Sequence, residues 1–168
     1  DFTGNILMRV ALLGTGPFAV PTLRALVESS HEVKLAVSRP PRGGRAQPSP
    51  VQQTAEELDV EVWLPETVNC DEARERLGAV ELALLVVCVY GGLLKPATLA
   101  VSRLGGINLH GSLLPKYRGA APVQWAVLRG EIETGNTVIQ MTPGLDAGPS
   151  LGGQRIPIDP NETAGQLE

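Results

Sequence analysis

The chain has 168 residues, of which 43% are hydrophobic, so it is long enough for one domain with a full core and too short for a second domain of ordinary size. The net charge of −4 argues against binding nucleic acid through the whole surface but leaves room for a local basic patch. No apolar stretch approaches the roughly 18 residues of a membrane span, and residues 1–7 lack the features of a signal peptide, so we expect a cytoplasmic protein that does not contact membranes.

The chain opens with a pattern typical of a strand, a glycine turn and a helix. The apolar run at residues 9–13 predicts the strand, and Pro17 suits the first turn of a helix that reaches about residue 29. The turn at residues 14–19 fits the dinucleotide pattern G-x-G-x-x-G/A, which also requires an acidic residue at the end of the second strand. That strand, residues 33–37, is followed by Ser-Arg instead. Two alternatives stay open: an NADP-binding oxidoreductase domain in which Arg39 meets a 2′-phosphate, and a turn that only packs the strand against the helix.

A basic loop follows the second strand. Residues 33–55 contain no acidic residue, and the loop carries Arg39, Arg42 and Arg45 among several prolines and glycines. Such a loop can be a solvated connection, but long loops in compact domains are often functional. It is therefore our best candidate for contacting phosphate.

Helices and strands continue to alternate through the middle of the chain. We expect helices at residues 50–58 and 71–77, a short strand at 60–64, and a short helix that Pro96 opens. The apolar run at residues 82–89 is typical of a parallel strand buried on both faces, and it makes Cys88 a buried free thiol. This order predicts an α/β fold, Rossmann-like, with a mostly parallel open sheet and helices on both faces.

The last third predicts a helix at residues 122–129 with Trp125 as a core anchor, and strands at 137–141 and 150–158. Between these two strands, Asp146 stands in a glycine-rich loop. A helix begins near residue 161 and the sequence then stops, so the chain looks cut short.

Asn108 and His110 are the strongest candidates for chemistry. They alternate with Ile107 and Leu109 on a predicted strand, so their side chains point the same way where the strand gives way to a loop. Amide donors from Asn108, a proton from His110 and the carboxylate of Asp146 together suit stabilisation of an oxyanion during acyl transfer to an amine. A single histidine without ligand-spaced partners argues against a metal site. Spacing alone leaves open that Asn108 caps a turn and His110 is a satisfied core group.

The segments 108–122, 133–135 and 144–148 resemble the signature of the formyltransferase family that uses 10-formyltetrahydrofolate. The similarity extends from about Arg9 to the end of the chain and implies the formyltransferase fold. It also implies that Asn108, His110 and Asp146 are the catalytic residues. The tetrahydrofolate-binding residues that it implies are Val89, Tyr90, Gly91, Leu93, Ser112, Leu113, Leu114, Pro115, Gly144 and Leu145.

Within this family, the resemblance is to the members that formylate the initiator methionyl-tRNA. We therefore expect methionyl-tRNA and the folate as partners, no metal, and a monomer. The tRNA-binding residues expected from local charge are Arg39, Arg42, Arg45, Lys116 and Arg118.

Two departures from the family pattern bear on this expectation. The basic loop is shorter than usual, and the family's C-terminal barrel-like domain, which helps to hold tRNA, is absent from the sequence. We thus expect residues 1–168 to form the catalytic domain alone. A formyltransferase acting on an amino sugar or a purine precursor and a non-catalytic tRNA-binding module are the alternatives.

Overall fold

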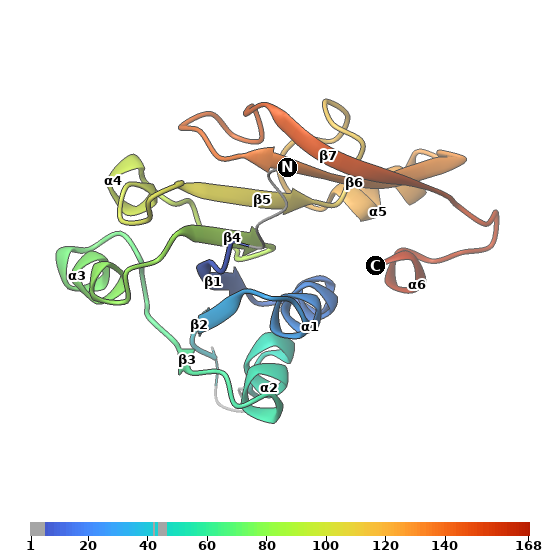
Figure 1. Cartoon of the computed structure of the whole chain (residues 1–168). Helices are drawn as coiled ribbons and strands as arrows, with labels where there is room; N and C mark the ends of the chain where they lie inside the picture. The colour runs from blue at the N-terminus through green and yellow to red at the C-terminus, as the bar shows by residue number, and fades with distance from the viewer. Residues whose placement is uncertain (1–5, 42, 44–46) are drawn as a thin grey trace. The chain divides into compact units, whose positions relative to one another are not determined.

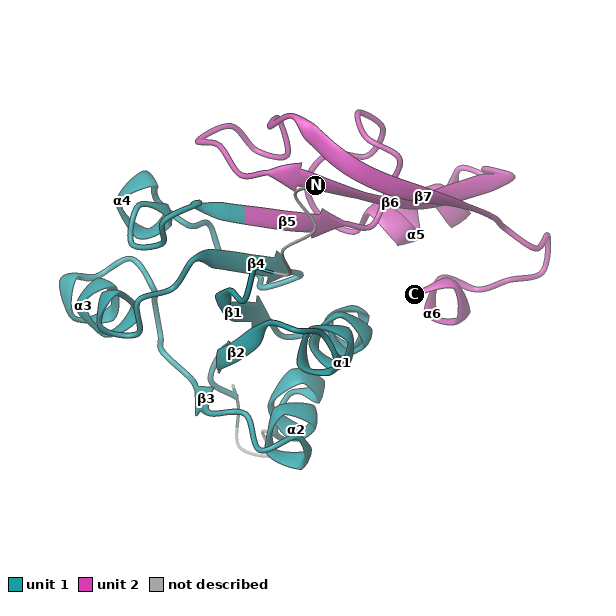
Figure 2. Cartoon of the chain, viewed as in Figure 1, with its two compact units in different colours: residues 1–106 teal, residues 107–168 magenta. Residues whose placement is uncertain are grey.

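The computed structural model describes residues 6–41, 43 and 47–168. The chain divides into two compact units, residues 1–106 and 107–168, which are coloured separately in Figure 2.

The first unit contains four parallel strands in the order β3-β2-β1-β4. These are β1 (Arg9–Gly14), β2 (Glu32–Val37), β3 (Val62–Trp63) and β4 (Leu84–Cys88). In β1 every residue after Arg9 is buried, and in β4 every residue after Leu84 is buried. Their continuous apolar sequences follow from this, because a strand covered on both faces does not alternate between apolar and polar residues.

Helices cover both faces of this parallel sheet. They are α1 (Val20–Glu28), α2 (Pro50–Glu57), α3 (Asp71–Ala79) and the short α4 (Pro96–Leu99), and a 3₁₀ turn, η1 (Pro17–Ala19), precedes α1. In Figure 1, α1 and α2 lie together on one side of the parallel strands and α3 on the other. Ser49 caps α2 by accepting a hydrogen bond from the Gln52 amide, and Pro50 occupies the first helical position, where its missing N–H costs nothing.

The glycine turn after β1 is a packing device at Gly14. A Cβ atom on Gly14 would lie 2.8 Å from both the Ala19 Cβ and the Cys88 carbonyl oxygen, so only glycine lets the turn pass between η1 and β4. This supports the interpretation of the turn as a close contact between strand and helix.

The second unit contains an antiparallel sheet whose strands follow the order β5-β6-β7. Its strands are β5 (Gly106–His110, of which Gly106 is the last residue of the first unit), β6 (Glu133–Gln140) and β7 (Ser150–Pro157), and its helices are α5 (Pro122–Leu128) and α6 (Ala164–Leu167). Asn108 lies opposite Ile139, and His110 lies opposite Thr137. β6 begins four residues before the predicted start at Thr137, since the polar residues that open it pair with β7.

The fold class predicted from the sequence is confirmed, as are the predicted strands and helices within a few residues at their ends. Cys88 is a buried free thiol, as expected. The position of Trp125 was predicted wrongly. The residue is 43% exposed, with the Arg129 guanidinium 5.6 Å from the centre of its ring, because α5 turns Val123 and Ala126 inward instead. In the ranges that the structure describes, no helix is long and apolar enough to cross a membrane.

Candidate active site

Asn108, His110 and Asp146 come together within the second unit. The Asn108 Nδ2 donates a hydrogen bond to the Asp146 Oδ1 over 3.2 Å, and the His110 Nδ1 lies 3.5 Å from the Asp146 Oδ2. The His110 and Asp146 side chains are only 7% and 9% exposed. Two of the three residues come from β5 and the third from the loop between β6 and β7, so the alternation on β5 decides that the amide and the imidazole share a face.

The loop that carries Asp146 is shaped by its glycines. A Cβ atom on Gly148 would lie 1.7 Å from the Gln140 carbonyl oxygen, so the loop can return to β6 only with glycine there. Asp146 itself has a left-handed backbone, with φ of 45°. This unusual conformation aims the carboxylate at Asn108 and at the Gly119 amide, which donates to the Asp146 Oδ2 over 2.8 Å.

His110 has an oxygen atom beside each ring nitrogen. Its Nε2 lies 2.8 Å from the Tyr117 carbonyl oxygen, which can only accept, so Nε2 carries a hydrogen and donates it. Its Nδ1 faces the Asp146 carboxylate. Because the contact of Nδ1 with the carboxylate is long at 3.5 Å, this side of the ring can also face a reacting group.

The loop after β5 is held by internal hydrogen bonds. The Ser112 hydroxyl donates to the Lys116 carbonyl over 2.6 Å. The Thr137 hydroxyl accepts from the Leu114 amide and donates to the Ser112 carbonyl, which ties the loop to β6. The segment that the family resemblance assigns to folate binding, residues 112–115, is therefore ordered by its own polar groups.

The first unit contributes a cavity of about 500 Å³ at the carboxyl ends of its strands. This cavity is lined by Thr15, Arg39, Pro40, Pro41, Gln47, Ser49, Val89, Tyr90 and Gly91. Ligands of open α/β sheets bind at this end of the strands. The cavity is thus lined by three residues expected to bind folate, Val89, Tyr90 and Gly91, and by Arg39, which is expected to bind phosphate.

Arg39 is held in this cavity by its contacts with the loop after β4. Its Nη2 donates to the Gly91 carbonyl over 2.8 Å, and its guanidinium lies 5.8 Å from the centre of the Tyr90 ring. Burial raises the pKa of the Tyr90 hydroxyl, and the nearby Arg39 charge acts in the opposite direction. The Arg39 Nε is buried without a hydrogen-bond partner.

The remaining predicted residues are distributed as follows. Lys116 pairs with Glu131, its Nζ lying 3.0 Å from Oε2, and Arg118 is exposed. Leu93 and Leu145 are 73% and 60% exposed. Arg42 and Arg45, predicted to bind tRNA, lie outside the described residues.

Sequence reasoning missed the partners of the three central side chains. Gly119, Tyr117 and Thr137 contact them or the loop around them through backbone groups or a single hydroxyl. Neither kind of contact leaves a periodic pattern in a sequence. The residue type carries a signal only at Gly119, whose φ of 87° favours glycine.

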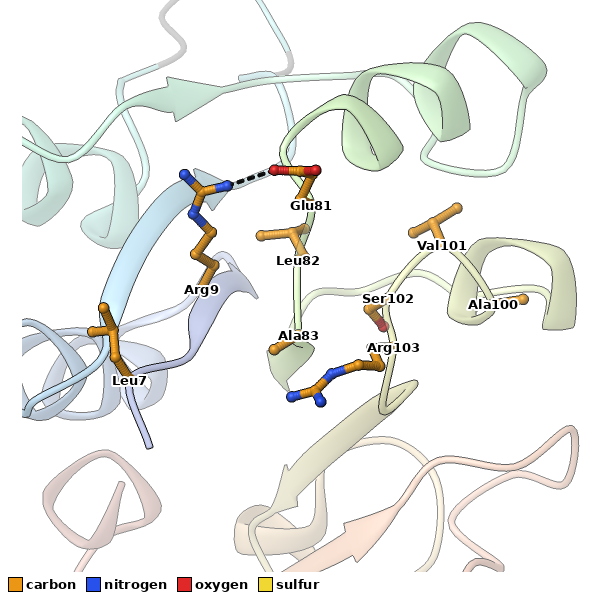
Figure 3. Close-up of a pocket in the computed structure, with 9 residues that line it drawn as sticks. All are labelled: Leu7, Arg9, Glu81, Leu82, Ala83, Ala100, Val101, Ser102 and Arg103. Carbon is orange, nitrogen blue, oxygen red and sulfur yellow. Dashed lines mark hydrogen bonds and ion pairs between the residues drawn. The ribbon is translucent and has the colours of Figure 1, made fainter. Parts of the chain in front are cut away.

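A larger cavity, of about 610 Å³, lies at the amino ends of β1 and β4 (Figure 3). In Figure 3 the Arg9 guanidinium reaches across it to the Glu81 carboxylate, 2.9 Å away. Because open α/β sheets bind ligands at the carboxyl ends of their strands, we do not assign the chemistry to this cavity. Among the described residues, no three His, Cys, Asp or Glu side chains gather as metal ligands.

Comparison with known proteins adds a family and close relatives. A family model described as formyl transferase matches residues 8–168. A methionyl-tRNA formyltransferase of Rhodopirellula baltica is 48% identical over 170 residues, which cover 96% of this chain and 50% of that protein. A second, from Novosphingobium aromaticivorans, is 46% identical over 164 residues, which cover 95% of this chain and 54% of that protein. The chain thus spans about half the length of these curated relatives.

Solved structures support the fold. A glycinamide ribonucleotide transformylase from Symbiobacterium toebii has a TM-score of 0.78 at 23% identity, with 98% of this chain and 80% of that chain covered. A phosphoribosylglycinamide formyltransferase from Bacillus halodurans also has a TM-score of 0.78, at 22% identity, with 95% and 84% covered. At this identity the likeness concerns the fold alone.

Proposed function

Because the chain belongs to the formyl transferase family, we propose that it forms the catalytic part of an enzyme that transfers a formyl group from 10-formyltetrahydrofolate to the amine of methionyl-tRNA, for translation initiation. The observation that carries this proposal is the cluster of Asn108, His110 and Asp146, joined by direct contacts of their side chains. The curated relatives favour methionyl-tRNA as the acceptor, since they are named for it and are 46–48% identical to this chain.

The chain's own groups suit this transfer. The folate derivative supplies the formyl carbonyl when it is bound. The Asn108 amide has two N–H groups and gives one to Asp146, so the other can donate to the carbonyl oxygen as that oxygen gains negative charge. His110 donates to the same oxygen through Nδ1, whose contact with Asp146 is long at 3.5 Å. Asp146 orients the ring and takes up the proton of the incoming amine through water.

Exposed apolar side chains fit the flat ring system of a folate. Beside Asp146, Leu145 is 60% exposed, and in the loop after β4, Val89 and Leu93 are 48% and 73% exposed. Large exposed apolar side chains are typical of a ligand-binding surface. We propose that they bind the folate together with residues 112–115, Gly144 and the Tyr90-Gly91 loop.

The acceptor would approach through basic side chains. Arg39 lines the 500 Å³ cavity, and Arg118 is exposed in the loop after β5. We propose that they contact phosphates of the tRNA. A purine precursor is the second candidate acceptor, because solved structures with the same fold are named glycinamide ribonucleotide transformylase.

The test measures donor and acceptor separately. Calorimetric titration of the 168-residue chain with a non-hydrolysable folate and with NADPH identifies the donor site, and we expect heat from the folate alone. Formyl transfer is then followed with methionyl-tRNA and with glycinamide ribonucleotide, and we expect the higher kcat/KM with methionyl-tRNA. Binding of NADPH without folate heat would overturn the proposal, and a preference for glycinamide ribonucleotide would favour the second candidate.

Two variants test the catalytic cluster. Asn108→Ala should lower formyl transfer by about 10²–10³ through loss of one oxyanion donor, and His110→Ala should lower it by about 10²–10⁴. Folate binding should be largely kept in both variants. The exposed Asn161→Ala is the matched control. Unchanged rates in the two site variants would make Asn108 and His110 structural residues.

A further inference from the structure

Tyr117 connects the candidate catalytic histidine to an acidic residue outside the site. Its carbonyl oxygen accepts the hydrogen of the His110 Nε2 over 2.8 Å. Its hydroxyl donates to the Glu131 Oε1 over 2.7 Å. One residue therefore holds the imidazole with its backbone and is itself held by its side chain.

Tyr117 needs such an anchor because its backbone is left-handed, with φ of 55°. This conformation is uncommon for a residue with a bulky side chain and persists only where the surroundings fix it. The preceding residue is tied to the same carboxylate, since the Lys116 Nζ lies 3.1 and 3.0 Å from the Glu131 Oε1 and Oε2. These three contacts with the Glu131 carboxylate fix the turn that presents the Tyr117 carbonyl.

Glu131 is suited to anchor this turn. It follows α5, and its amide donates to the Ala126 carbonyl over 3.1 Å. Its side chain is 24% exposed. The hydrogen bond from Tyr117, and then the one from Lys116, lower the pKa of Glu131, while the bond to Glu131 raises the pKa of Tyr117. At neutral pH the carboxylate is therefore charged and the phenol keeps the proton that it donates, which is the stronger form of this hydrogen bond.

We propose that Glu131 is a positioning residue for formyl transfer, acting through Tyr117 to fix the orientation of the His110 ring. With the carbonyl of Tyr117 in place, Nε2 must carry a hydrogen, and Nδ1 is turned to Asp146 and the reacting group. The effect on rate rests on the proposed function, whereas the hold on His110 is a property of the structure itself.

The experiment compares Tyr117→Phe, Glu131→Ala and Glu131→Gln with the matched control Glu133→Gln, whose native carboxylate pairs with Arg155 on the surface. The first readout is the hydrogen-exchange rate of the His110 Nε2–H, measured by NMR on the 168-residue chain. Assignment is simple because the chain has only two histidines. The second readout is kcat for formyl transfer and KM for the folate donor.

We expect Tyr117→Phe and Glu131→Ala to speed exchange of the Nε2–H and to lower kcat, each by about tenfold, with KM for the donor within about twofold. Glu131→Gln should change the exchange rate and kcat much less, because its carboxamide oxygen still accepts a hydrogen bond from the Tyr117 hydroxyl. The double variant Tyr117→Phe/Glu131→Ala should be no worse than Glu131→Ala, since Glu131→Ala already removes the bond from the Tyr117 hydroxyl. Glu133→Gln should behave as the unsubstituted chain.

Several results would overturn the proposal. These are unchanged exchange of the Nε2–H in Tyr117→Phe and Glu131→Ala, additive losses in the double variant, or an equal loss in Glu133→Gln. If Glu131→Ala fails to fold, Tyr117→Phe and Glu131→Gln carry the test, because each changes very few atoms. If the variants change the exchange of the Nε2–H but the chain shows no formyl transfer, the proposed function is refuted. The role of Glu131 and Tyr117 in positioning His110 is then still supported.

Discussion

Replacing Asp146 with asparagine tests the candidate site most directly, because asparagine keeps the shape of the side chain and removes its charge. Both carboxylate oxygens of Asp146 accept hydrogen bonds, and an amide side chain cannot accept all of them. Oδ1 accepts from the Asn108 Nδ2 over 3.2 Å, and Oδ2 accepts from the Gly119 amide over 2.8 Å and faces the His110 Nδ1. In Asp146→Asn one of these positions becomes an NH₂ group that faces a donor.

The loss of free energy follows from these contacts. Whichever way the new amide is turned, at least one hydrogen bond to a charged group is lost, and such a bond contributes about 1.5–3 kcal/mol. With the Asp146 side chain only 9% exposed, water replaces little of it. We expect the free energy of unfolding to fall by about 2–3 kcal/mol. Formyl transfer should fall by about 10²–10⁴, because the site loses the carboxylate that orients the His110 ring and takes up the proton of the amine.

Urea denaturation of the 168-residue chain measures the first effect, as a lower midpoint at unchanged slope. The control is Asp159→Asn, a substitution at an exposed turn where the carboxylate accepts from the Asn161 amide. A fall below about 0.5 kcal/mol in Asp146→Asn, the range of ordinary surface substitutions, would show that the contacts of Asp146 do not stabilise the chain and would refute the reasoning.

Three further predictions concern other parts of the chain. Gly148→Ala should lower the free energy of unfolding by at least about 1–3 kcal/mol in a urea titration, since its Cβ would strike a β6 carbonyl; Gly152→Ala, with nothing within 4 Å of its Cβ, is the control and should change little. Burial raises the pKa of Cys88 to about 11, so iodoacetamide at pH 8 should label Cys70 and spare Cys88 until the chain unfolds, which peptide mass analysis would show. Because the folded chain disfavours the Cys88 thiolate, the contribution of the Cys88 thiol to stability is full below pH 9 and is lost as the pH rises toward 11. Equal labelling of Cys70 and Cys88 in the folded chain would contradict the burial of Cys88. Arg118→Gln should reduce the salt dependence of methionyl-tRNA binding by about one unit of slope if it contacts one phosphate, and an unchanged slope would exclude that contact.

The sequence predicts those features of the structure that follow from the short-range pattern of apolar, polar and glycine residues. Alternation on β5 correctly placed Asn108 and His110 on one face, and the unbroken apolar run of β4 correctly indicated a strand buried on both faces. The glycines around Asp146 indicated a loop, and the structure shows their reason in the close approach of Gly148 to β6. These features depend on residues that are close together in the sequence, so they can be predicted from the sequence alone.

The unpredicted part depends on neighbours in space. Trp125 lies away from the helical face that Val123 and Ala126 turn inward, and a helix of seven residues is too short for periodicity to determine which face is buried. The hold of Tyr117 on His110 uses a backbone carbonyl and a left-handed φ, neither of which has a signature in residue type. The direction of β6 and β7 also depends on pairing across turns, since parallel and antiparallel strands can share the same apolar pattern.

The position of Thr137 affects how the second unit unfolds locally. It lies opposite His110 on β6, and its hydroxyl holds the loop after β5 by two hydrogen bonds, so the loop and the paired strands stabilise one another. Local opening would therefore release strand and loop in one cooperative event. The amide of Leu114, although it lies outside any strand, should exchange its hydrogen as slowly as the amides of the β5–β6 pair.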